Sequence, residues 1–170
     1  YAKMTVEDLC IITADRKLIE GDWKPTSEIA LHTLIYTRRP DVQAVVHTHA
    51  PYCSLFAVSG EPLPMVLTES AMLLGGDVPV APYFTPGSEE LARATAETLA
   101  DQPAALMANH GAISVGPDLA AAYAATIAAE DTARTVCQLR AMNAPIKALP
   151  PEVTARLRSA YLKKYRPTKA

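Results

Sequence analysis

The sequence predicts a single α/β domain in which helices cover a sheet. The chain has 170 residues, 49% of them hydrophobic, which is enough to bury one substantial core. Short apolar runs alternate along the chain with segments of helical periodicity, the pattern of a sheet packed against helices. No repeat, low-complexity tail or linker long enough to separate two domains interrupts this order. We therefore expect residues 1–170 to form one domain.

The N-terminal part of the chain is expected to form a hairpin followed by a helix. Residues 8–21 contain two short apolar runs joined by charged turn residues, as in a β-hairpin. Thr26 or Ser27 is expected to cap the helix that follows, because a hydroxyl there can accept a backbone N–H. Glu28 then falls in the first helical turn, where a carboxylate is favourable, and Pro40 ends the helix.

The middle of the chain is expected to form short strands. Residues 42–50 are a mostly apolar run and are predicted to be a strand. Two segments interrupted by proline, 61–67 and 77–84, are expected to be further short strands. Residues 68–76 lie between them and are expected to form a short helix or a turn.

The second half of the chain is richer in helix. Residues 87–102 are predicted to be a helix that starts near Ser88. Residues 104–116 read strand, turn and strand around an Asn-His-Gly sequence. Residues 117–142 form a long alanine-rich helical pattern, and a final amphipathic helix is expected after Pro151.

Composition excludes several classes of protein. The formal net charge of −2 and the pI near 6.1 provide no general attraction to nucleic acids or to acidic membranes. Cys10, Cys53 and Cys137 are odd in number, widely spaced and outside any C-x-x-C pattern, which favours a reducing compartment over a disulfide framework. No apolar run approaches the roughly 18 to 20 residues of a membrane span. We expect a cytoplasmic protein.

Two of the four histidines stand one residue apart at the end of the apolar run over 42–50. Alternate strand residues point to the same side of a sheet, so His47 and His49 would present both imidazoles in one direction while Thr48 faces the other way. This arrangement suits two ligands of one metal ion, although a merely polar strand end would have the same pattern. A metal site needs a third ligand, and usually a carboxylate as well.

The other two histidines are the candidates for a third ligand. His110 lies where an apolar strand meets a glycine turn, so its side chain is expected at the edge of the sheet. His32 lies four residues after Glu28 on the predicted helix and therefore on the same face. It is interpreted as a ligand, as a partner of the ligands or as a plain surface residue.

Four segments, taken in order, resemble the class II aldolase/adducin family. They are KPTSE (24–28), RPDVQAVVHTHAPYC (39–53), GGDVPVAPYFTPGSEELA (75–92) and ANHGAISVGPDLAAAYAATIAAEDTAR (108–134). The resemblance implies a three-layer α/β/α sandwich around a largely antiparallel central sheet. It also implies a homotetramer with active sites between neighbouring subunits.

The resemblance further implies a metal site and its chemistry. In the family, the histidines that match His47, His49 and His110 bind a divalent ion, usually Zn²⁺, with Mn²⁺ or Co²⁺ as alternatives. The glutamate that matches Glu28 is a metal ligand at rest and an acid/base during turnover. Three neutral imidazoles leave Zn²⁺ its double charge and open positions for substrate oxygens.

The implied reaction is the cleavage of a ketose 1-phosphate such as fuculose 1-phosphate. The products are dihydroxyacetone phosphate and an aldehyde, formed through a metal-stabilised enediolate. A sister enzyme on the same site stays open: a sugar-phosphate epimerase, a sugar-acid phosphate decarboxylase, or a methylthioribulose-phosphate aldolase or dehydratase. A non-enzymatic adducin-like scaffold is disfavoured, because all four metal-binding positions are retained.

The sequence also departs from the family pattern. Thr68, with Glu69 beside it, stands where the aldolases have the tyrosine that handles the aldehyde-side proton, so the general acid is not identified. The tyrosines available for that role are Tyr52, Tyr83, Tyr161 and Tyr165.

The second departure is at the beginning of the chain. The family has an N-terminal helix and a Gly-Asn-x-Ser type loop that binds substrate phosphate, and this sequence begins after both. Thr26 and Ser27 match the remaining part of the phosphate site. We therefore expect Tyr1 to lie inside a longer natural chain, with residues 1–170 forming a class II aldolase/adducin-like domain that lacks the N-terminal segment.

Overall fold

A computed structural model describes residues 4–164 of the chain. Its central sheet has four strands in the order β3 (Ala44–Thr48), β6 (Gly111–Gly116), β5 (Ala104–Met107) and β4 (Val80–Ala81). The pairs β3 with β6 and β6 with β5 are antiparallel, and β4 runs parallel to β5. The expectation of a largely antiparallel sheet is confirmed.

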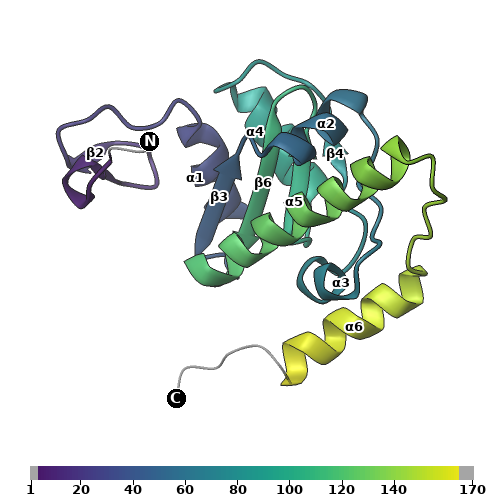
Figure 1. Cartoon of the computed structure of the whole chain (residues 1–170). Helices are drawn as coiled ribbons and strands as arrows, with labels where there is room; N and C mark the ends of the chain where they lie inside the picture. The colour runs from purple at the N-terminus through teal and green to yellow at the C-terminus, as the bar shows by residue number, and fades with distance from the viewer. Residues whose placement is uncertain (1–3, 165–170) are drawn as a thin grey trace.

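Helices cover both faces of this sheet (Figure 1). One face carries α1 (Ile29–Arg38) and α4 (Glu89–Leu99), and the other carries α2 (Pro51–Ser59), α3 (Thr68–Leu74) and α5 (Leu119–Ala141). The expected three-layer α/β/α sandwich is therefore confirmed.

Each face of the sheet has its own apolar core. The core under α1 and α4 is built on Leu31, Ile35, Leu91, Leu99, Met107 and Ile113. The core under α2, α3 and α5 is built on Phe56, Leu63, Met65, Leu106, Ala129 and Val136. Successive residues of β5 and β6 alternate between the two cores, so every residue of both strands is buried. This explains why these strands are continuous apolar runs in the sequence.

Small side chains let α5 lie close to the sheet. Its buried residues are alanine or threonine except for Val136. Gly116, at the end of β6, faces the first turn of α5 so closely that an added Cβ would lie 2.6 Å from the backbone nitrogen of Ala122. The alanine-rich composition of this segment thus serves close helix-on-sheet packing.

The predicted hairpin over 8–21 is confirmed as β1 (Ile11–Ile12) and β2 (Leu18–Glu20), which pair outside the central sheet after a short 3₁₀ turn, η1 (Val6–Asp8). It lies beside α1 at one side of the molecule (Figure 1). Arg16 in the hairpin turn attaches it to the sandwich: its guanidinium donates to the Thr33 hydroxyl over 2.9 Å and forms an ion pair with Glu89.

The predicted cap of the next helix is wrong. The helix α1 begins at Ile29, and Glu28 itself occupies the capping position outside the first turn. The Thr26 hydroxyl accepts the N–H of Glu28 over 3.2 Å in a local turn, so neither Thr26 nor Ser27 caps the helix. The Glu28 side chain is instead buried, with 7% of its surface exposed.

Residues 51–67 also differ from the prediction. The helix α2 follows His49 almost directly and was not predicted; Pro51 at its first position suits a helix start. The strand expected over 61–67 reduces to a single bridge between Leu63 and Val78, because the prolines on both sides of Leu63 cannot donate to a ladder.

Several other elements agree with the prediction, although the strand expected over 77–84 is reduced to β4 (Val80–Ala81). Residues 68–74 form α3, Ser88 caps α4 by accepting the N–H of Leu91 over 3.1 Å, and α6 (Pro151–Lys164) begins at the second proline of the final pair. Arg158 joins α6 to α3 by donating to the carbonyls of Met72 and Leu73 over 3.0 and 2.7 Å. Within residues 4–164, no helix has both the length and the apolar character that crossing a membrane requires.

Candidate metal centre

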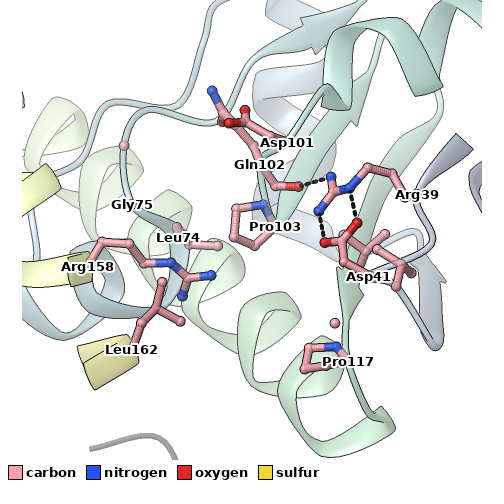
Figure 2. A pocket seen from close by; sticks show the side chains of 14 residues that line it. Arg39, Asp41, Leu74, Gly75, Asp101, Gln102, Pro103, Pro117, Arg158 and Leu162 are labelled. Carbon is pink, nitrogen blue, oxygen red and sulfur yellow. Dashed lines mark hydrogen bonds and ion pairs between the residues drawn. The ribbon is translucent and has the colours of Figure 1, made fainter. Parts of the chain in front are cut away.

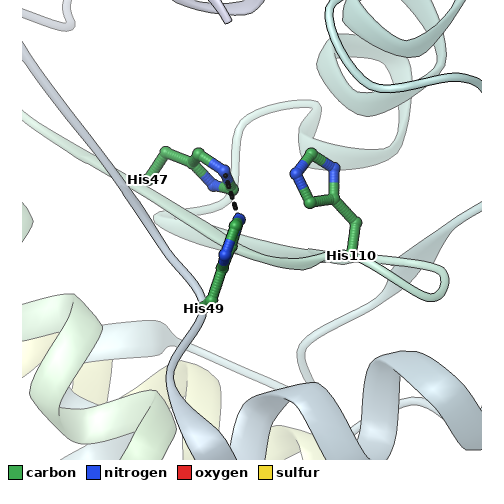
Figure 3. Close-up of side chains that lie close together, drawn as sticks. All are labelled: His47, His49 and His110. Carbon is green, nitrogen blue, oxygen red and sulfur yellow. Dashed lines mark hydrogen bonds between the residues drawn. The ribbon is translucent and has the colours of Figure 1, made fainter.

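Three histidines meet at one end of the sheet. His47 lies on β3, His49 follows the end of that strand, and His110 lies in the turn between β5 and β6 (Figure 3). One ring nitrogen from each can be chosen so that all three atoms lie within 4.8 Å of one another. Their ring centroids are 4.9 to 5.1 Å apart. They meet because the end of β3 pairs with the start of β6, with Thr48 opposite Ala112.

Hydrogen bonds orient the imidazoles. Nδ1 of His47 lies 3.0 Å from the carbonyl oxygen of Ala112, so this nitrogen carries the proton and Nε2 faces the centre. Nε2 of His47 and Nε2 of His49 lie 3.2 Å apart. Such a pair needs a proton or a cation between the two lone pairs. This is the arrangement expected of two ligands of one ion.

The Asn-His-Gly turn places His110 close to the end of β3. Asn109 has φ +55°, in the left-handed region that asparagine tolerates, and the N–H of His110 bonds the carbonyl of Met107 over 3.0 Å. A Cβ on Gly111 would overlap the carbonyl oxygen of Thr48 and would lie 3.0 Å from Cδ2 of His49. Glycine is therefore required for this approach of the two segments.

Glu28 lies outside the three-histidine group but interacts with it electrostatically. Its carboxylate favours the charged forms of both His47 and His110. Among residues 4–164, no hydrogen-bond partner lies within reach of the buried Oε2 of Glu28 or the buried Nδ1 of His110. Buried polar atoms are normally paired, so these two atoms fit a site that receives a cation.

Burial sets the protonation of the histidines. Desolvation lowers the pKa of His47, and the neighbouring imidazoles of His110 and His49 lower it further, against the Ala112 hydrogen bond and the Glu28 charge. Desolvation also lowers the pKa of His110, with Glu28 acting in the opposite direction. Both imidazoles are therefore neutral at pH 7, the form in which histidine binds a metal ion.

The other predicted site residues line a cavity whose lining does not include the three histidines. Thr26, Ser27 and His32 contribute to a cavity of about 820 Å³ between the N-terminal segment and α1, together with Trp23 and Tyr36. His32 lies outside the three-histidine group. Burial lowers the pKa of His32, and its proximity to His47 lowers this pKa further, so His32 is a neighbour of the cluster.

Within residues 4–164, no hydrogen bond or ring contact joins the candidate tyrosines to the three histidines. Tyr83 is exposed, Tyr52 lies in the first turn of α2, and the guanidinium of Arg158 lies over the ring of Tyr161 at 6.0 Å. Tyr165 lies outside the described residues. Thr68 starts α3 at the surface, with Glu69 exposed beside it.

A second cavity lies at the opposite end of the sheet (Figure 2). It has a volume of about 530 Å³ and is lined by Val42 and Gly116, which flank the start of β3 and the end of β6. None of the predicted site residues contributes to it. Its arginines have structural partners: Arg39 donates to both oxygens of Asp41 over 2.8 and 2.7 Å, and Arg158 bonds the end of α3.

Sequence reasoning did not single out Glu130, which lies on α5 and accepts backbone N–H groups of α2 just after His49. The one signal in the sequence is a carboxylate in the middle of a long alanine-rich helix, where the neighbouring apolar residues face the core. Its partners are distant in the chain and could not be predicted.

The fold and the three-histidine cluster define an α/β protein with a candidate metal centre at one end of its sheet. The sequence model described as Class II Aldolase and Adducin N-terminal domain matches residues 1–137. The chain belongs to the class II aldolase and adducin family.

Relatives with assigned names agree with this family. The chain is 37% identical over 150 residues to the 5-deoxy-D-ribulose 1-phosphate aldolase of Bacillus thuringiensis serovar kurstaki, covering 88% of this chain and 70% of that protein. It is 40% identical over 118 residues to the 5-methylthioribulose-1-phosphate/5-deoxyribulose-1-phosphate aldolase of Rhodospirillum rubrum, covering 67% of this chain and 53% of that protein.

A solved structure of an L-fuculose 1-phosphate aldolase superposes with a TM-score of 0.89 at 28% identity, covering 95% of this chain and 75% of that chain. The expectation of an enzyme of the aldolase class is confirmed by these matches together.

Proposed function

We propose that this chain cleaves a ketose 1-phosphate to dihydroxyacetone phosphate and an aldehyde, using a divalent metal ion. The observation that carries the proposal is the convergence of His47, His49 and His110, with candidate ligand atoms within 4.8 Å of one another. Beside them lies Glu28, a buried carboxylate whose Oε2 has no hydrogen-bond partner among residues 4–164.

The three histidines would hold the ion. Three imidazole nitrogens are a ligand set typical of catalytic zinc, and Mn²⁺ or Co²⁺ would fit the same donors. When bound, the ion supplies positive charge that stabilises the negative charge developing beside the substrate carbonyl. His47 and His110 suit this role because burial keeps them neutral at pH 7.

Glu28 would move the proton of the reaction. Its carboxylate is buried at the start of α1 and interacts with His47 and His110, so it faces the same space as the proposed ligands. The same carboxylate would serve as a metal ligand when substrate is absent, and as a positioned acid/base when it is free of the ion.

Thr26 and Ser27 would contact the substrate phosphate. Both line the 820 Å³ cavity and precede the N-terminus of α1, where the helix dipole favours an anion. The Thr26 hydroxyl accepts the N–H of Glu28, and its own proton remains able to donate to a phosphate oxygen.

The lysines also favour metal-assisted chemistry over a Schiff base. A Schiff-base lysine is usually desolvated, so that its amine is neutral and nucleophilic. The lysines within residues 4–164 are all exposed. This part of the chain therefore has no buried lysine that could activate the substrate carbonyl as a Schiff base in place of a metal ion.

The second candidate is a five-carbon substrate without a terminal hydroxyl. The relative that is 37% identical is named for 5-deoxy-D-ribulose 1-phosphate, and the Rhodospirillum rubrum relative is named for its 5-methylthio counterpart as well. These substrates would break at the same bond and release the same dihydroxyacetone phosphate. Epimerase, decarboxylase and dehydratase reactions on this site remain the alternatives that a product screen separates.

The proposed setting is a cytoplasmic homotetramer. An exposed apolar stripe on α5, formed by Leu119, Tyr123 and Ile127 at four-residue spacing, suits contact between subunits. Light scattering at micromolar concentration is expected to give a mass near four chains. A monomer would contradict this part of the proposal.

The test of the proposed function is a product screen. Zinc-loaded full-length protein is incubated with L-fuculose 1-phosphate, 5-deoxyribulose 1-phosphate and 5-methylthioribulose 1-phosphate, and dihydroxyacetone phosphate is measured by coupled reduction. We expect it from at least one substrate and from none with His110→Ala. An epimer, carbon dioxide or a dehydrated product in its place would overturn the aldolase assignment.

A further inference from the structure

The helix α2 connects the two segments that carry the histidines. It begins at Pro51, two residues after His49. Near its other end, the carbonyl of Ala57 accepts the N–H of Asn109 over 3.1 Å, and Asn109 directly precedes His110. This nine-residue helix is therefore a second connection, beside the pairing of β3 with β6, between the segments that carry His49 and His110.

The start of α2 is capped by a residue from another helix. Ala50 at its capping position has no side-chain acceptor. Glu130 on α5 takes that role: its Oε1 accepts the N–H of Tyr52 over 3.0 Å, and its Oε2 accepts the N–H of Cys53 over 2.8 Å. A carboxylate at a helix N-terminus also interacts favourably with the helix dipole.

The contact between Glu130 and α2 lies among buried residues. Ala129 and Ala133 next to it on α5 are buried, and α5 packs along β6 and β3. Cys53, whose N–H the carboxylate accepts, is 1% exposed, and the same carboxylate adds to burial in raising the pKa of the Cys53 thiol. Glu130 thus attaches α2 to the helix that lies on the sheet.

We propose that Glu130 is a positioning residue of the metal centre. It holds α2 against α5, and α2 holds His49 and His110 at the spacing that one ion requires. The inference rests on the proposed metal site, but it concerns metal affinity and geometry rather than the identity of the substrate. Glu130 does not itself contact the histidines in the structure.

Two variants and one control test the inference. In Glu130→Gln the side chain keeps its shape but offers a single acceptor oxygen to two N–H groups, and in Glu130→Ala both groups lose their acceptor. Glu61→Gln is the matched control. It breaks the ion pair between Glu61, just after α2, and Arg140 on α5, which measures 2.7 Å, and leaves the backbone N–H groups of α2 untouched.

The readouts are the Zn²⁺ dissociation constant, by competition with a chromophoric chelator, and the visible absorption spectrum of the Co²⁺-substituted chain. We expect Zn²⁺ to bind about 10-fold more weakly in Glu130→Gln and up to about 100-fold more weakly in Glu130→Ala, the range for residues that orient metal ligands. The Co²⁺ bands should shift in both variants. Glu61→Gln should match the wild type in both readouts.

Four outcomes would overturn the inference or the proposals on which it rests. Wild-type affinity and an unchanged Co²⁺ spectrum in folded Glu130→Gln would overturn the inference, whether or not Glu130→Ala folds. Equal weakening in Glu61→Gln would also overturn it, because the effect would then come from any loss of contact between this region and α5. A wild type that binds neither ion would overturn the proposed metal site itself. A wild type that binds zinc but cleaves no ketose phosphate would overturn the proposed reaction, and the affinity series would still test Glu130.

Discussion

The two ends of the central sheet carry polar groups of opposite character. At the end where β3 begins, Arg39 bonds both oxygens of Asp41 and the carbonyl of Ala100, so charges and carbonyls partner one another. At the end where β3 finishes, Oε2 of Glu28 and Nδ1 of His110 are buried without a hydrogen-bond partner within residues 4–164. Buried polar atoms are normally paired, so two unpaired ones beside three histidines fit a site that receives a ligand. The difference supports the proposal that the histidine end is the functional one.

Removal of a ligand should have the largest effect. We expect His110→Ala to lose most of its bound zinc and nearly all activity while remaining folded, because His110 lies in a turn at the sheet edge and contributes little to either core. Zinc content after dialysis, kcat and circular dichroism are measured on one preparation. His32→Ala is the matched control, since His32 is partly buried nearby but lies outside the three-histidine group. Full zinc occupancy in His110→Ala would remove it from the ligand set.

The second-largest effect on activity is expected from replacing Glu28, the proposed proton carrier. We expect Glu28→Gln to retain zinc on three imidazoles but to lower kcat by about 10² to 10⁴, the usual scale for a positioned acid/base, with KM changed much less. Metal content is measured beside kcat and KM. Zinc loss in proportion to activity would reduce Glu28 to a ligand, and full activity would exclude it from the mechanism.

A smaller effect is expected from adding one methyl group between the ligand segments. In Gly111→Ala the new Cβ overlaps the Thr48 carbonyl, so we expect the free energy of unfolding to fall by about 1 to 3 kcal/mol and zinc to bind more weakly. Gly76→Ala, at the opposite cavity, places its Cβ in open space and should change neither quantity. Urea unfolding and zinc competition measure both. Equal behaviour of the two variants would contradict the close approach at Gly111.

The smallest functional effect is expected at the structural end. Arg39→Ala should lower the free energy of unfolding by about 1 to 2 kcal/mol through its lost carbonyl partners, with kcat and zinc affinity unchanged. Arg39 also holds the pKa of Asp41 below its ordinary value of about 3.9. A carboxyl whose pKa is lower in the folded chain than in the unfolded chain stabilises the folded state at pH values above the unfolded pKa. This stabilisation is lost as the pH falls through the folded-state pKa. The variant should therefore lose part of its acid sensitivity below about pH 3.9. Altered zinc binding would contradict the separation of the two ends.

Elements with a complete local signal could be predicted from the sequence. The hairpin over 8–21, the Ser88-capped helix and the strand, turn and strand over 104–116 each contain their own apolar pattern and turn or capping residue. The helix α2 could not be predicted, because its nine residues are apolar on all sides and its cap comes from Glu130, far along the chain. The cap of α1 was mispredicted because Thr26 bonds locally and Glu28 turns inward.

The convergence of the three histidines could be predicted to a similar depth. Two histidines lie at the end of one strand and the third lies in the tight turn before another. They are expected to meet if these two strands pair antiparallel, as they do. What the sequence could not provide is the contact of α2 with α5, because it depends on distant segments that no local pattern connects.

The most direct test of the metal centre is X-ray absorption at the zinc edge of the reconstituted wild-type chain. We predict one zinc ion per chain, with three imidazole nitrogens among its neighbours and the remaining positions filled by oxygen. Fewer than three imidazoles, or a sulfur neighbour from one of the cysteines, would contradict the assignment of His47, His49 and His110 as the ligands.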